Sequence, residues 1–258
     1  MTKPLAADYL MLLFFLLYPF LNWLWLWPRL VRATAAGVPG ARTADYWGTI
    51  AIEWIFTVYV LALWFVFGRS WDSLYLGRAP FLRLGLGLAL GLAVILFFCQ
   101  QHRTIFARPK LIESVRQKVS FADPFSPHTD AERYHFWFVA ITAGICEEIL
   151  YRGFLFSFLL ALFSFLGAWT GIIAAIVISS IVFGCAHIYQ GYRLVPRIAL
   201  VGLFFAVVVV LTKSLWPAIL IHAAIDLHSG ELAFGVHRAA SQESPGRFAA
   251  DLLPDKSA

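Results

Sequence analysis

Apolar runs long enough to span a bilayer recur along this chain, and they constrain its fold more than any other feature. The first run, from Tyr9 to Trp27, carries no charged residue, and the run from Tyr46 to Phe67 is interrupted only by Glu53. A helix needs about 20 mainly apolar residues to cross the hydrocarbon. The chain has 258 residues, 60% hydrophobic and 14% charged, which leaves room for roughly seven or eight such helices. The sequence therefore predicts an all-α, polytopic membrane protein, with about seven to eight transmembrane helices around a polar cavity.

The distribution of polar residues divides the chain into three expected parts. These are N-terminal transmembrane helices with a polar, partly amphipathic connector (1–133), a core (134–230) and a polar, disordered tail (231–258). Within the connector, residues 111–119 alternate apolar and charged side chains, which predicts an interfacial amphipathic helix or, alternatively, a simple connecting loop. Residues 136–165 are expected to form one long helix, which Gly167 to Gly171 separate from the next.

The basic residues predict the orientation of the chain. The net charge is +5, and the Lys and Arg residues lie mainly between apolar runs, where they contact lipid headgroups and mark cytoplasmic loops. With seven spans, 14 basic residues fall on one side and 5 on the other, with Arg152 inside a span. This places the N-terminus outside the cell membrane and the tail in the cytoplasm, whereas two spans within 136–165 would reverse all that follows. Basic clusters with interleaved aromatic residues are absent, so nucleic acid is not an expected partner.

The cysteines indicate no disulfide framework. Cys99, Cys146 and Cys185 all lie in apolar runs without a CxxC pair, so each is interpreted as a small buried apolar residue. A Cys-His hydrolase built on Cys185 and His187 is a minor alternative, because nothing in the sequence near Cys185 would activate its thiol.

Ionisable residues inside the predicted spans are few. Each costs at least about 2.5–3.5 kcal/mol to insert, so each is a functional hypothesis by default. Six of the seven lie in the second half of the chain; the full set is Glu53, Glu147, Glu148, Arg152, His187, His222 and Asp226. Glu53 has no visible partner, which favours a structural or interfacial role for it.

The segment from Cys146 to Arg152 places two carboxylates and an arginine on one helix. Glu148 and Arg152 are four residues apart and share a face, so they are expected to form a pair that lowers the cost of burying both. Glu147 points about 100° away and has no local basic partner. An unpaired carboxylate of this kind is a candidate general base.

Two further patterns follow on later helices. His187 lies beside the small residues Gly184 and Ala186, and His222 lies four residues before Asp226 on a shared helix face. Alone, each pattern has a structural reading: a stabilising ion pair, a hydrogen-bonded core histidine, or a local tertiary contact. The ordered set of six residues favours one site.

The motifs Glu147-Glu148-Ile-Leu-Tyr-Arg152, Phe183-Gly-Cys-Ala-His187 and His222-Ala-Ala-Ile-Asp226 resemble the signature of the CPBP family (CAAX protease and bacteriocin-processing, or Abi). These are intramembrane glutamic endopeptidases related to the type II CAAX prenyl protease. The resemblance covers roughly residues 134–230 and implies an all-helical fold whose water-filled cavity opens to the cytoplasm. Its implied partners are protein or peptide substrates at the membrane.

The resemblance also implies a role for each site residue. Glu147, assisted by His187, would activate water, and Glu148 and Arg152 would position the helix. His222 and Asp226 would bind the oxyanion, although Asp226 stands where eukaryotic members usually have Asn, and an ionised Asp donates no hydrogen bond. Asp226 then orients His222 instead. No HExxH pair is present, so a metal-free reaction is expected, with zinc bound by the same residues as the alternative.

Three classes of function are thus distinguished. The first is a membrane-embedded endopeptidase. The second is a proton-coupled transporter that relays protons through Glu147, Glu148 and Asp226, which is disfavoured because no internal repeat is visible. The third is a non-catalytic immunity or scaffold protein that uses the same fold.

Overall fold

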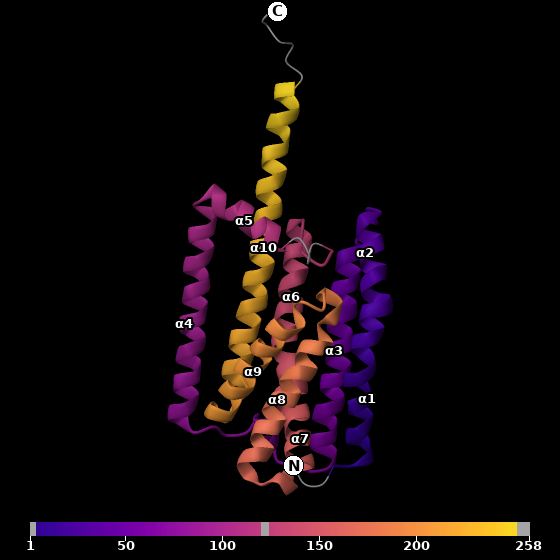
Figure 1. Cartoon of the computed structure of the whole chain (residues 1–258), viewed down its shortest axis with the longest axis vertical. Helices are drawn as coiled ribbons and strands as arrows, with labels where there is room; N and C mark the ends of the chain where they lie inside the picture. The colour runs from indigo at the N-terminus through magenta and orange to yellow at the C-terminus, as the bar shows by residue number, and fades with distance from the viewer. Residues whose placement is uncertain (1–3, 120–123, 252–258) are drawn as a thin grey trace, which may run out of the picture.

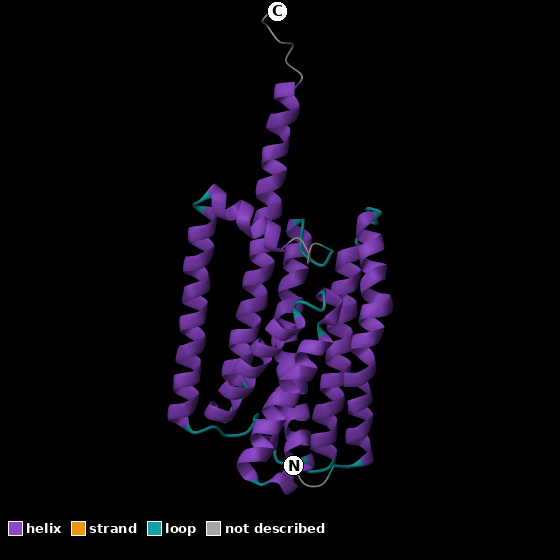
Figure 2. Ribbon diagram, viewed as in Figure 1, coloured by secondary structure: helices purple, strands orange, loops and turns teal. Residues whose placement is uncertain are grey.

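The computed structural model describes residues 4–119 and 124–251, with the backbone alone for 117–119 and 242–251. Every regular element in this part of the chain is helical, as the predicted fold class requires (Figure 2). In order, the elements are α1 (Ala6–Leu21), η1 (Asn22–Leu26), α2 (Trp27–Ala35), α3 (Ala41–Val66), η2 (Trp71–Leu74), α4 (Phe81–Phe106), α5 (Pro109–Val119), α6 (Asp130–Glu147), η4 (Glu148–Leu155), α7 (Phe156–Leu162), η5 (Ser164–Leu166), α8 (Ala168–Ala186), η6 (Ile188–Gln190), α9 (Val195–Thr212) and α10 (Trp216–Asp251).

Six helices among the described residues are long and apolar enough to cross a membrane. They are Ala6–Ala35, Ala41–Val66, Phe81–Phe106, Ala168–Ala186, Val195–Thr212 and Trp216–Ser241. A further helix runs without a break through α6, η4 and α7 and traverses the bundle, although charged residues lie in its middle (Figure 1). Counting this helix, the bundle is crossed seven times, in agreement with the prediction of about seven to eight spans.

The helices alternate in direction, so α1 begins at one end of the bundle and α10 ends at the other (Figure 1). The long helix over 136–165 is confirmed as one crossing, and Gly167 precedes the start of α8 as expected. Residues 111–119 lie in the helix α5. Of the two predicted alternatives, the helix is therefore confirmed and the simple connecting loop is wrong. This is the seven-span arrangement that the predicted orientation assumed, with the start of α1 and the end of α10 at opposite ends of the bundle (Figure 1).

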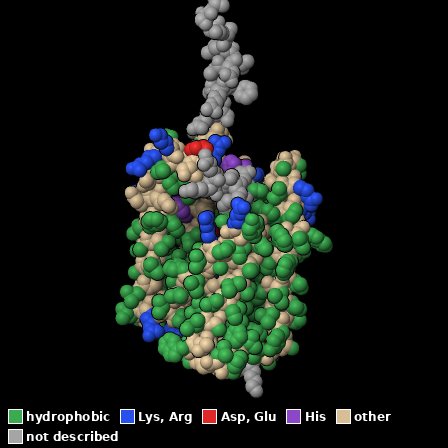
Figure 3. All heavy atoms as spheres, in the orientation of Figure 1, with side chains coloured by type: hydrophobic (Ala, Val, Ile, Leu, Met, Phe, Trp, Pro, Cys, Tyr) green, Lys and Arg blue, Asp and Glu red, His purple; other side chains and the backbone are tan. Residues whose placement is uncertain are grey.

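The outer surface of the bundle suits a lipid environment. Large apolar side chains are exposed along the helices, among them Phe65 at 79%, Phe81 at 92% and Trp169 at 81% exposure. In Figure 3, hydrophobic side chains cover the middle of the visible face, and Lys and Arg lie toward its ends. A soluble protein rarely exposes so large an apolar surface, whereas a bilayer solvates it.

The expected disordered tail is corrected for residues 231–251, because α10 continues through Asp251. Tertiary contacts hold the helix beyond residue 230. Glu231 accepts hydrogen bonds from Arg133 at 2.7 Å and from the indole of Trp137 at 2.7 Å, and Phe234 is buried under the Arg133 guanidinium. Residues 252–258 lie outside the described part of the chain, and the three domain boundaries stay predictions.

Close packing of α6 against α10 brings the site together. A Cβ added to Gly144 would lie 2.8 Å from both the backbone nitrogen and the Cβ of Ala223, the residue after His222. A glycine at this position therefore lets the backbones of the two helices approach one turn from the carboxylates.

We expect Gly144→Ala to push α10 away from α6 and to destabilise the fold by about 1–3 kcal/mol, as overpacking usually does. The measurement is the thermal unfolding midpoint in detergent. Gly85→Ala on α4 is the matched control, because nothing lies within 4 Å of its added Cβ. Equal midpoints for both variants would contradict this account of the interface.

Candidate active site

The segment Glu147–Arg152 carries the buried charges of the long helix. Its helix begins with a capping box, in which Thr129 accepts from the backbone of Glu132 and the Glu132 carboxylate accepts from the backbone of Thr129. Glu147 ends the α-helical part, and Glu148 begins a π-helical segment, η4. π-Helical segments within α-helices are often found at functional sites.

The predicted pair of Glu148 and Arg152 is confirmed. Arg152 donates to Glu148 Oε1 at 2.9 Å and to the carbonyl oxygen of Gly202 at 3.3 Å. Its guanidinium also lies 4.1 Å from the ring centroid of Phe183. The two charged side chains are 0% and 2% exposed, so each depends on the other for compensation.

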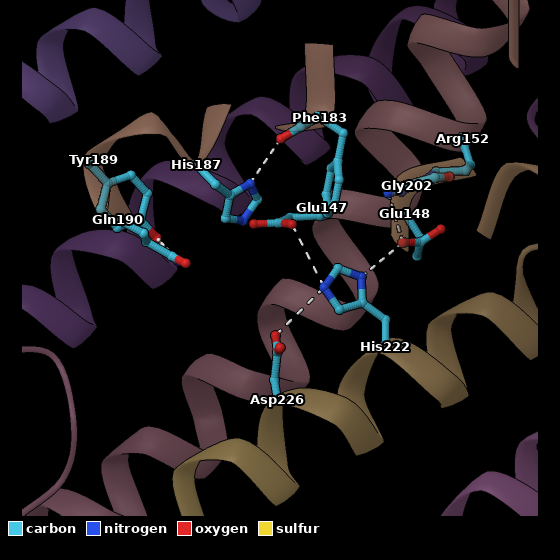
Figure 4. Close-up of polar contacts among 10 residues, drawn as sticks. All are labelled: Glu147, Glu148, Arg152, Phe183, His187, Tyr189, Gln190, Gly202, His222 and Asp226. Atoms are coloured by element: carbon cyan, nitrogen blue, oxygen red, sulfur yellow. Dashed lines mark hydrogen bonds and ion pairs between the residues drawn. The ribbon is translucent and has the colours of Figure 1, made fainter. Parts of the chain in front are cut away.

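Glu148 also holds His222, a contact that the sequence did not predict. His222 Nδ1 lies 2.8 Å from Glu148 Oε1 (Figure 4). A carboxylate only accepts hydrogen bonds, so the imidazole donates from Nδ1. The other nitrogen, Nε2, then faces Asp226 Oδ2 at 3.6 Å and Glu147 Oε2 at 3.8 Å. The orientation of His222 thus comes from Glu148, on the opposite side of the ring from Asp226.

His187 follows the last residue of α8, and its ring points into the same region as the Glu147 carboxylate (Figure 4). Its Nδ1 is 2.9 Å from the carbonyl oxygen of Phe183. Because a carbonyl oxygen only accepts, Nδ1 carries the hydrogen of that bond and the neutral ring has an unprotonated Nε2. This second nitrogen is able to exchange a proton.

Two cavities meet at these residues. One, of about 460 Å³, lies along α1, η1, α2 and α3, and the other, of about 330 Å³, lies between α3, α6 and α10. Glu147 and His187 line both, and His222 and Asp226 line the second. The predicted convergence of Glu147, His187 and His222 is therefore present. Glu147, at 18% side-chain exposure, opens to this space, while Glu148, at 0%, is sealed behind His222.

Two ionisable residues that line both cavities, Glu53 and Tyr189, were not predicted as site residues. Glu53 on α3, expected to be structural or interfacial, lies on the wall shared with Glu147. Its isolated position in an apolar run was the available signal. Tyr189 also lines both, and burial raises the pKa of its phenol, so the hydroxyl keeps its hydrogen. No sequence pattern distinguished Tyr189 from the other tyrosines.

The cysteine alternative gains no support from this geometry. Cys99, Cys146 and Cys185 are free thiols; Cys146 is buried as expected, whereas Cys99 and Cys185 are exposed, and Cys185 lines neither cavity. Within the described ranges, no group of three or more His, Cys, Asp or Glu side chains is arranged to hold a metal ion.

A bundle of membrane-spanning helices with carboxylates and histidines buried around a cavity defines a polytopic protein with an intramembrane site. Residues 130–228 match the family model of the type II CAAX prenyl endopeptidase Rce1-like proteins. This segment holds all six of the predicted site residues, and the match confirms the resemblance to CAAX proteases. No curated protein and no solved structure matches the chain. Because the family is one of proteases, the match supports a peptidase that acts at the membrane.

Proposed function

We propose that the protein is an intramembrane endopeptidase that hydrolyses peptide bonds with water activated by Glu147 and His187. The observation that carries this proposal is that Glu147 at the end of α6, His187 just after α8 and His222 on α10 line one cavity. Hydrolysis needs a base for water, a donor for the oxyanion and a proton for the leaving amine, and these groups supply all three.

Glu147 acts as the general base. It removes a proton from water while the water oxygen attacks the substrate carbonyl. His187, with Nδ1–H held by Phe183 O, helps to pass this proton to the leaving nitrogen through Nε2. The carbon–nitrogen bond then breaks, and the products are a carboxylic acid and an amine.

His222 acts as the donor to the oxyanion in its doubly protonated form. Its Nδ1–H is bonded to Glu148, so its Nε2–H is directed toward the cavity. Asp226, 3.6 Å from Nε2, compensates the charge of this imidazolium instead of donating. Glu148 and Arg152 are positioning residues, since they act on the reaction through the His222 ring.

The two cavities suit a substrate that is cut internally. They meet at Glu147 and His187, so each is able to hold one side of the scissile bond. The family description indicates membrane-associated proteins with a prenylated CAAX box as the substrate class.

The substrate is expected to reach the cavities from the end of the bundle at which α10 ends. The cavities are lined by Val38 and Gly40 of the α2–α3 loop and by Phe125 of the α5–α6 loop, and these two loops lie toward the end of the bundle from which α10 extends (Figure 1). The positive-inside rule assigns this end to the cytoplasm. We therefore place the site in the cell membrane, open to the cytoplasmic side.

We expect the purified protein to cleave a quenched fluorescent peptide that ends in a prenylated CAAX box, and to do so after exhaustive chelation. The reason is that Glu147 has no local cation and no HExxH pair is present to bind zinc. The measurement is the initial rate with and without chelator, together with the zinc content of the protein. If chelation abolished cleavage and zinc alone restored it, Glu147, His187 and His222 would be ligands of a metal-bound water. A proton-coupled transporter or a non-catalytic immunity or scaffold protein would cleave nothing.

A further inference from the structure

Glu53 is the one residue of the predicted intramembrane set that the proposed mechanism leaves without a role. It lies on α3 and lines both cavities, as Glu147 does. Its Oε2 is buried, and within the described residues Glu53 forms no hydrogen bond or ion pair. A buried carboxyl without a partner does not stabilise a fold, so a structural role does not explain it.

Glu147, which lines the same two cavities, presents the same feature. Its Oε2 is buried without a hydrogen-bond partner, and His222 Nε2, 3.8 Å away, is too far to form a hydrogen bond. Both carboxyls thus line the same two cavities, and the described chain supplies no hydrogen-bond donor to the Oε2 of either. Water carries two hydrogens on one oxygen, so a single water molecule is able to donate to both carboxyls at once. Water is also a reactant of the proposed hydrolysis.

Building on the proposed function, we propose that Glu53 is the second acceptor for the attacking water. The water donates one hydrogen to Glu147 and the other to Glu53, which turns a lone pair of its oxygen toward the substrate carbonyl. Two acceptors fix the orientation of the water, whereas Glu147 alone would leave it free to rotate about a single hydrogen bond.

The proton balance separates the roles of the two carboxyls. During attack, the O–H bond that points to Glu147 breaks, the carbon–oxygen bond forms, and the carbonyl electron pair moves to the oxygen beside His222. The O–H bond that points to Glu53 stays intact, so Glu53 neither gains nor loses a proton. The proton on Glu147 then leaves with the amine when the carbon–nitrogen bond breaks.

This division of roles predicts different outcomes for three substitutions, measured as kcat and KM on the prenylated CAAX peptide and as thermal unfolding midpoints. Glu53→Leu removes both acceptor oxygens and is expected to lower kcat about 10- to 100-fold with little change in KM. Its midpoint should equal or exceed that of wild type, because an unpaired buried carboxyl is replaced by an apolar group. Glu53→Gln retains an amide oxygen that accepts, so it should keep most of the activity. Glu147→Gln should lose about 10²–10⁴-fold, since an amide cannot take the proton.

Each other outcome has a defined meaning. Full kcat in Glu53→Leu would overturn the inference, and so would a Glu53→Gln variant as inactive as Glu147→Gln, which would make Glu53 a proton-transfer group. A fall in the midpoint, or a failure to fold, would show that Glu53 is structural and would equally overturn it. Wild-type activity in Glu147→Gln, or an inactive wild type, would instead overturn the proposed function on which the inference rests.

Discussion

Replacing Glu147 with Gln is expected to leave a folded protein that has lost peptide cleavage by about 10²–10⁴-fold, the usual effect of losing a general base. Gln is nearly isosteric with Glu, and the Glu147 carboxylate forms no hydrogen bond within the described chain that the amide would break. The fold should therefore tolerate the change while the reaction does not. The measurement is kcat on the prenylated CAAX peptide at matched thermal stability.

The control for this experiment is Glu113→Gln on α5. That carboxylate is 58% exposed and lies on a separate helix from the site residues, so its removal should leave kcat unchanged. A Glu147→Gln variant that cleaves as fast as Glu113→Gln would refute the assignment of the base.

Removing Glu148 is expected to have the largest effect on stability. Glu148→Ala leaves Arg152, which is 2% exposed, without its carboxylate, and breaking a buried pair costs about 3–5 kcal/mol. It also removes the acceptor of His222 Nδ1. We expect a lower yield of folded protein and a lower unfolding midpoint in detergent, in addition to lost activity.

A double variant separates these two consequences. Glu148→Leu with Arg152→Leu removes both buried charges and should recover much of the stability, because an apolar pair needs no compensation. It should not recover activity, since His222 still lacks the acceptor that orients it. A Glu148→Ala protein with normal yield and midpoint would contradict the role given to the pair.

The architecture was largely predictable because a bilayer leaves few choices for a chain of this kind. Runs such as Tyr46–Phe67 have to be helices in lipid, where every backbone group needs an internal partner. The charged residues were equally informative, because burying Glu148 and Arg152 is costly enough that their spacing of four indicated a pair, and the structure contains it.

Contacts between segments that lie far apart in the sequence were not predicted. The bond from His222 to Glu148 joins residues 74 positions apart, and helix periodicity carries no information about it. Glu53 is also far from the motifs in the sequence, and only the packing of α3 brings it to their cavity. The helix beyond residue 230 was missed because Glu231 reads as a polar tail residue until Arg133 and Trp137 are seen beside it.

The central claim, that this site cuts proteins at the membrane, is tested most directly by comparing the termini of membrane proteins in cells that express the wild type and in cells that express Glu147→Gln. The account predicts a defined set of new termini that appear with the wild type and are absent with Glu147→Gln at equal protein level. Identical termini in the two kinds of cell would contradict it.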